Sequence, residues 1–236
     1  MISRPDIRRV LAWMTTFFIA MAFLESAVVV YLRALFYPNG FEFPIVPMHG
    51  VLVTTEVIRE FATLVMLLAP GALVTRSALE RFAWFCYGFG VWDIFYYVWL
   101  KVLLDWPSSL MTCDLLFLIP VPWVGPVWAP CVISFGLILL ALLILRGRSN
   151  GVLRLVDTRA WALLITGAMI MVGSFMVDPL LNSFDLDALK AAASLSRNEA
   201  PISYVPTAYP WPLFAVGSFV AMAGLTRVHR KGCLVR

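Results

Sequence analysis

The chain has 236 residues, of which 61% are hydrophobic and 14% are charged, and its mean hydropathy is +0.88. Ordinary soluble domains have about 45–50% apolar and about 25% charged residues, so this composition excludes a water-soluble globular protein. The formal net charge is +4, but the basic residues are scattered and no Lys/Arg run is interleaved with aromatic residues, which argues against nucleic acid as a partner. The sequence predicts one all-α integral membrane domain over 1–236, with the lipid bilayer as its surroundings.

Six windows of mostly apolar residues are long enough to cross a bilayer as helices, which takes about 20 residues each. The first window follows several Arg residues, as a signal peptide does, but it is longer and lacks a small-residue cleavage site, so we expect a retained helix. The fold class predicted is therefore a six-transmembrane-helix bundle. The predicted spans are 10–35, 47–72, 81–104, 126–146, 159–180 and 209–227.

The distribution of Lys and Arg predicts the orientation, because short cytoplasmic loops carry an excess of both residues. Thirteen of the 18 Lys and Arg residues fall at the N-terminus, the C-terminus and the alternate loops between them. This pattern predicts that both termini are cytoplasmic, in a bacterial-type inner membrane.

Two segments are predicted to lie at the outer surface. The stretch 105–130 is rich in tryptophan and broken by five prolines, so we expect a short helix followed by an extended stretch at the interface. The stretch Ser183–Arg197 has the spacing of an amphipathic helix lying flat on the surface. Cys113 and Cys131 share the outer side and can pair, although buried unpaired thiols are the favoured interpretation.

The most informative residues are charged and fall inside the first three spans. Each costs at least about 2.5–3.5 kcal/mol at a helix centre on insertion scales, so we expect them to face the bundle interior with partners. Counting from the outer helix ends places Glu25, Glu56 and Asp93 at one depth. The predicted intramembrane polar cluster is Glu25, Glu56, Arg59, Glu60 and Asp93.

Helical spacing extends this cluster toward the outside, because residues four or seven apart share a face. His49 lies on the face of Glu56 and Glu60, and Tyr97 and Lys101 lie on the face of Asp93. The outer access to the polar cluster is therefore predicted to be lined by His49, Tyr97 and Lys101.

Four acids against one arginine leave a formal charge of −3, which a low-dielectric site holds only with bound protons or cations. The leading hypothesis is a transport or coupling subunit that handles protons, a small cation or a polar solute. A purely structural reading is a neutralised network that only fixes helix packing.

Two other functions remain open from the sequence. A non-catalytic subunit or assembly factor of a larger complex would contact other membrane subunits through 105–130. A membrane-embedded enzyme acting on a lipid-like substrate would hold a divalent metal with Glu56, Glu60, Glu25 and Asp93. No motif identifies a cofactor, and a bound quinone or lipid remains open.

Overall fold

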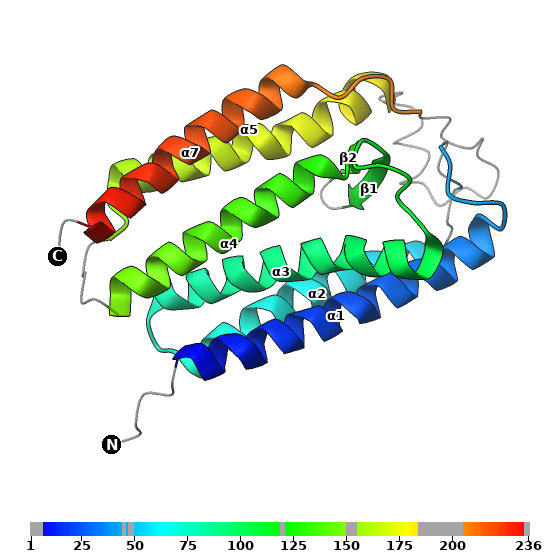
Figure 1. Cartoon of the computed structure of the whole chain (residues 1–236). Helices are drawn as coiled ribbons and strands as arrows, with labels where there is room; N and C mark the ends of the chain where they lie inside the picture. The colour runs from blue at the N-terminus through cyan, green and yellow to red at the C-terminus, as the bar shows by residue number, and fades with distance from the viewer. Residues whose placement is uncertain are drawn as a thin grey trace.

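The computed structural model of the chain describes residues 7–43, 46, 50–118, 121–149, 155–183 and 205–233. These residues form a bundle of long helices with a small antiparallel hairpin at one end (Figure 1). The helices are α1 (Ile7–Phe36), α2 (Val51–Val74), α3 (Ala78–Leu104), α4 (Trp128–Ser149), α5 (Thr158–Ser183) and α7 (Trp211–Cys233). The strands are β1 (Cys113–Phe117) and β2 (Trp123–Pro126).

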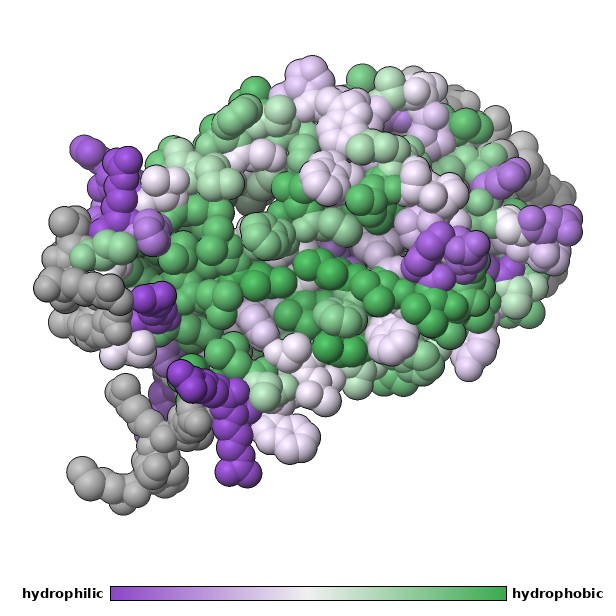
Figure 2. All heavy atoms as spheres, in the orientation of Figure 1, coloured by the Kyte–Doolittle hydropathy of each residue, from purple (hydrophilic) through white to green (hydrophobic). Residues whose placement is uncertain are grey.

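The helices have the length and the surface of membrane-spanning segments. α1, α2, α4, α5 and α7 are each long and apolar enough to cross a bilayer. Large apolar side chains such as Leu35, Leu73 and Phe219 are more than two-thirds exposed. Figure 2 shows hydrophobic residues over most of the visible face, with hydrophilic residues toward its two ends. The structure thus confirms an all-α membrane protein, and each predicted span overlaps one observed helix.

The helices pack in an order that places α3 and α4 at the centre. α1 and α2 both pack on α3, α3 packs on α4, and α7 packs on α4 and α5. Phe18, Trp84 and Ile144 are almost fully buried in the core that joins the first four helices. α1 begins and α7 ends at the same end of the bundle, whereas the hairpin lies at the opposite end (Figure 1).

The buried face of α2 is polar, which is the reverse of the pattern in a water-soluble helix. Its buried residues are Glu56, Glu60, Thr63, Leu67 and Gly71, while most of the remaining side chains are exposed. The C-terminal part of this face packs tightly, because a Cβ at Gly71 would lie 3.0 Å from the Cβ of Trp84. The polar residues Glu56, Glu60 and Thr63 lie in the N-terminal part of the same face and are also directed toward the bundle, as expected for charge within a membrane.

The prediction for 105–130 is wrong in its short helix, whereas part of the predicted extended stretch forms two strands. The described residues of this segment form no helix before α4; instead β1 and β2 pair as an antiparallel hairpin, with a bulge between Leu115 and Phe117. Asp114 and Val124 are only 3% exposed, so the hairpin packs between the helices instead of lying flat on the outer surface. Strand pairing satisfies the backbone groups that prolines would leave unpaired in a helix, and Pro126 occupies a strand end, where proline is tolerated.

Two further predictions concern single segments, and one close helix contact was not predicted. Cys113 and Cys131 are free thiols, so they do not pair. The amphipathic helix predicted over Ser183–Arg197 lies, apart from Ser183, outside the described residues. α5 and α7 meet at glycines, since a Cβ at Gly167 would lie 2.7 Å from the carbonyl oxygen of Gly217.

Candidate functional site

A cavity of about 390 Å³ lies between the helices and the hairpin. Its lining residues come from α1, the segment that follows it, α2, α3, the hairpin, α4 and α5. All five residues of the predicted polar cluster lie in this lining. The acidic and basic residues of the lining are Glu25, Arg33, Glu56, Arg59, Glu60, Asp93 and Asp114.

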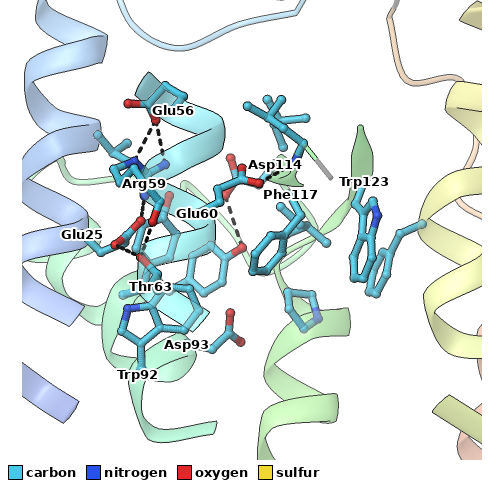
Figure 3. Close-up of a pocket in the computed structure, with 18 of the residues that line it drawn as sticks. Glu25, Glu56, Arg59, Glu60, Thr63, Trp92, Asp93, Asp114, Phe117 and Trp123 are labelled. Carbon is cyan, nitrogen blue, oxygen red and sulfur yellow. Dashed lines mark hydrogen bonds and ion pairs between the residues drawn. The ribbon is translucent and has the colours of Figure 1, made fainter. Parts of the chain in front are cut away.

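Arg59 joins two of the predicted acids. Its guanidinium forms an ion pair with Glu25 of α1, and it bonds Glu56 one turn earlier in α2 at 2.7 Å and 2.9 Å. The Thr63 hydroxyl donates to the Glu25 carboxylate at 3.0 Å. These four side chains form a bridged group between α1 and α2, with Arg59 itself 23% exposed (Figure 3). We name Glu25, Glu56, Arg59 and Thr63 the arginine group.

The other two predicted acids contact different elements. The Glu60 carboxylate accepts the backbone N–H of Leu118 at 3.0 Å and 3.2 Å, which ties α2 to the end of β1. The Asp93 carboxylate accepts the hydroxyl of Ser134 at 2.7 Å, which ties α3 to α4. Figure 3 shows the labelled carboxyls spread along the cavity from Glu56 to Asp93, so they do not form one compact layer.

Arg33 and Asp114 also line the cavity, although neither was predicted as a site residue. The Arg33 guanidinium lies 3.7 Å from the Asp114 carboxylate, and the Tyr97 hydroxyl donates to the same carboxylate at 3.2 Å. Arg33 also lies over the ring of Trp106, 3.8 Å from its centroid, and over Phe41 at 4.5 Å. Asp114 is the only charged residue of the apolar run 109–130, which is the signal that could have found it.

Burial changes the protonation of Asp114. Desolvation raises the pKa of this hairpin carboxyl to about 6, although the Arg33 charge and the Tyr97 hydrogen bond act in the opposite direction. A carboxyl with such a pKa changes its charge near neutral pH.

The three residues predicted to line an outer access lie in different places. Tyr97 is buried and lines the cavity. Lys101 lies outside the lining, where it pairs with Asp105 at 2.7 Å and donates to the carbonyl oxygen of Pro107 at 3.2 Å. His49 lies outside the described residues.

The cavity has a charged part and an aromatic part. Glu25, Glu56 and Arg59 lie beside α1 and α2, whereas Phe117 and Trp123 lie toward α5 (Figure 3). Five carboxyl groups face two guanidinium groups in the lining, which is a formal charge of −3. Within the described residues, the indole N–H groups of Trp92 and Trp123 are buried and have no hydrogen-bond partner.

The geometry does not gather the predicted metal ligands. Among the residues that the structure describes, no three His, Cys, Asp or Glu side chains come close enough to hold one metal ion. Glu56, Glu60 and Asp93 each bond a different partner instead. These side chains therefore do not fit a multi-carboxylate metal site, and no step through a metal follows from them.

The described architecture is thus a cavity inside a bundle of membrane helices, lined by both charged groups and aromatic rings. No protein-family model matches this chain, and neither a curated protein nor a solved structure does.

Proposed function

We propose that this chain is a six-span protein of a bacterial-type inner membrane that exchanges protons, a small cation or a polar solute at this cavity, as a transporter or a coupling subunit. The observation that carries the proposal is the collection of five carboxyl and two guanidinium groups around one membrane-embedded cavity. Its formal charge of −3 is stable in a low-dielectric setting only when protons or cations neutralise it.

The helix that brings the proposed number of spans from five to six is α3, the third helix of the chain. With 27 residues it is about 40 Å long at the usual rise per residue, which exceeds the hydrocarbon thickness. α3 is not among the five helices that are apolar enough to span a membrane by composition alone, and it carries Asp93 and many aromatic residues. A helix packed between α1, α2 and α4 has little contact with lipid and tolerates that composition.

The orientation rests on the charges at the helix ends. Arg146 and Arg148 lie in the last turn of α4, and Arg230 and Lys231 lie in the last turn of α7. Both turns lie at the end of the bundle where α1 begins (Figure 1). The excess of basic residues there supports a cytoplasmic position for this end.

A docking role for 105–130 has less support than cation or proton exchange. The hairpin packs its residues against α5, since a Cβ at Gly125 would lie 2.6 Å from the Phe175 ring. Its Trp123 side chain lines the cavity, so that part of the segment is not offered to a partner.

Proton and cation flux into vesicles tests the proposed function. Purified protein is reconstituted with an entrapped pH dye, and internal pH is followed after a jump in external pH or an imposed Na⁺, K⁺ or NH₄⁺ gradient. Glu60→Gln and Asp93→Asn should each slow the exchange about tenfold, since each removes a titratable group from the lining.

The matched controls are Glu42→Gln and Asp105→Asn, which make the same chemical changes at exposed positions outside the lining. Both controls should retain wild-type exchange. Exchange no faster than in protein-free vesicles, or equally fast in all four variants, would contradict the proposal.

A further inference from the structure

The volume of the cavity exceeds what protons or an inorganic ion need. One water molecule occupies about 30 Å³ in the liquid, so 390 Å³ would be a large space for a single hydrated path. Pockets of about 300–1,000 Å³ hold small organic molecules and are mostly apolar, with a few polar groups that orient the ligand. The cavity has the volume and the mixed lining of that class.

The aromatic part supplies a wall for an apolar body. Phe89 of α3 stacks on Phe117 of β1 with an interplanar angle of 16°. Trp123 of β2 stacks on Phe175 of α5 with an angle of 9°. These four rings line the same cavity as the carboxyl groups. Aromatic faces carry negative electrostatic potential, so this wall attracts an organic cation as the acids do.

Residues beside the cavity are exposed on the outside of the bundle. Ala168 of α5 lines it and is exposed, and its neighbour Met169 is 66% exposed. Beside Glu60 on α2, Phe61 is 63% exposed. A ligand dissolved in the bilayer would meet the cavity from this side.

We propose that the cavity binds a lipophilic organic cation, with its charged centre near the carboxyl groups and its apolar body against the aromatic wall. The inference rests on the proposed function and names the class of cation that this function concerns. A bare inorganic cation would not contact the aromatic rings, and an organic anion would be repelled by the formal charge of −3 in the lining.

The test is equilibrium binding of radiolabelled tetraphenylphosphonium to the full chain in lipid nanodiscs, with binding to empty nanodiscs subtracted. Wild-type protein should bind the cation saturably. Tetraphenylborate has the same shape and the opposite charge, and it should show no saturable binding. This comparison uses only wild-type protein, so it does not depend on any variant being folded.

Two variants then locate the site. Phe89→Leu combined with Phe117→Leu should weaken tetraphenylphosphonium binding about tenfold, because both rings of a stacked pair in the wall are lost. Phe219→Leu changes a ring that is 77% exposed on α7 and should bind as wild type does. Equal binding of the two opposite ions, or equal affinity of the double variant and the control, would overturn the inference.

The flux assay separates this inference from the function on which it rests. If proton or inorganic cation flux depends on the carboxyl groups but tetraphenylphosphonium does not bind saturably, only the inference of an organic cation is overturned. The absence of both would overturn both.

Discussion

Arg59 of α2 forms an ion pair with Glu25 of α1, although both helices pack mainly on α3. The pair therefore joins two helices that otherwise meet α3 separately, and Thr63 supports it with a hydrogen bond to Glu25. A buried charge is stable only beside an opposite charge, and Arg59 is the single cation of the arginine group. Loss of Arg59 should therefore lower the stability of the folded protein strongly.

Arg59→Met is expected to destabilise the protein by about 3 kcal/mol, because it leaves Glu25 and Glu56 without their cation in a poorly solvated place. The lower end of the range for buried pairs is expected since Arg59 keeps 23% of its side chain exposed. Thermal unfolding of the purified protein in one detergent measures the change.

The control is the combination of Arg59→Met with Glu25→Gln and Glu56→Gln, which removes the uncompensated charges. Much of the stability should return in this triple variant. If it is as unstable as Arg59→Met alone, the loss comes from packing of the arginine side chain and not from buried charge.

The pH dependence of stability should contain a contribution from Asp114. Its pKa of about 6 in the folded protein exceeds the value of about 3.9 in an unfolded chain. The folded state therefore binds the proton more tightly, so this contribution to stability is fully present below about pH 4 and is lost as pH rises through about 6. The expected loss is about 3 kcal/mol, from about 1.4 kcal/mol per pKa unit.

Comparison with Asp114→Asn isolates this contribution, because the amide does not titrate and the other carboxyls are unchanged. Between about pH 4 and pH 7 the wild type should lose more stability than the variant. Parallel stability curves over this range would show that Asp114 ionises in the folded protein as it does in the unfolded one.

The helices and the cluster were predictable because their signals are local. Apolar windows of the required length marked each helix, and charges within those windows marked Glu25, Glu56, Arg59, Glu60 and Asp93 as inward-facing. A membrane imposes these constraints residue by residue, so a single sequence reveals them. The spacing of Glu56 and Glu60 correctly predicted that both lie on the buried face of α2.

The partners of those residues were not predictable, because they depend on contacts between distant segments. Nothing local shows that Glu60 meets the backbone of Leu118, or that Asp93 meets Ser134 on α4. The hairpin was missed for a related reason. Prolines in 105–130 excluded a long helix. The pairing of β1 with β2, in which Cys113 lies opposite Pro126, joins residues that only the folded chain brings together.

The proposed orientation can be tested with the native cysteine at the end of α7. Cys233 is exposed and Cys86 is buried, while Cys113 and Cys131 are half-buried. A variant that keeps Cys233 and carries serine at the other three positions should react with a membrane-impermeant maleimide in inverted membrane vesicles. In right-side-out vesicles it should stay unlabelled until detergent is added. Labelling with the reverse preference would place this end outside.

The contact between α5 and α7 makes a prediction with a control on the same helix. A Cβ at Gly167 would lie 2.6 Å from the backbone nitrogen of Ala221 and 2.7 Å from the carbonyl oxygen of Gly217, and backbone cannot move aside as a side chain can. At Gly173, also on α5, a Cβ would meet nothing within 4 Å.

Gly167→Ala should therefore separate α5 from α7 and cost about 1–3 kcal/mol of stability, as overpacking of a close interface does. Gly173→Ala should leave stability unchanged or raise it by up to about 1 kcal/mol, because alanine has the higher helix propensity. Thermal unfolding of the two variants under identical conditions makes the comparison. Since the added methyl group is the same in both, a difference in melting temperature reports the space at each glycine, and equal melting temperatures would show that the two helices do not meet closely at Gly167.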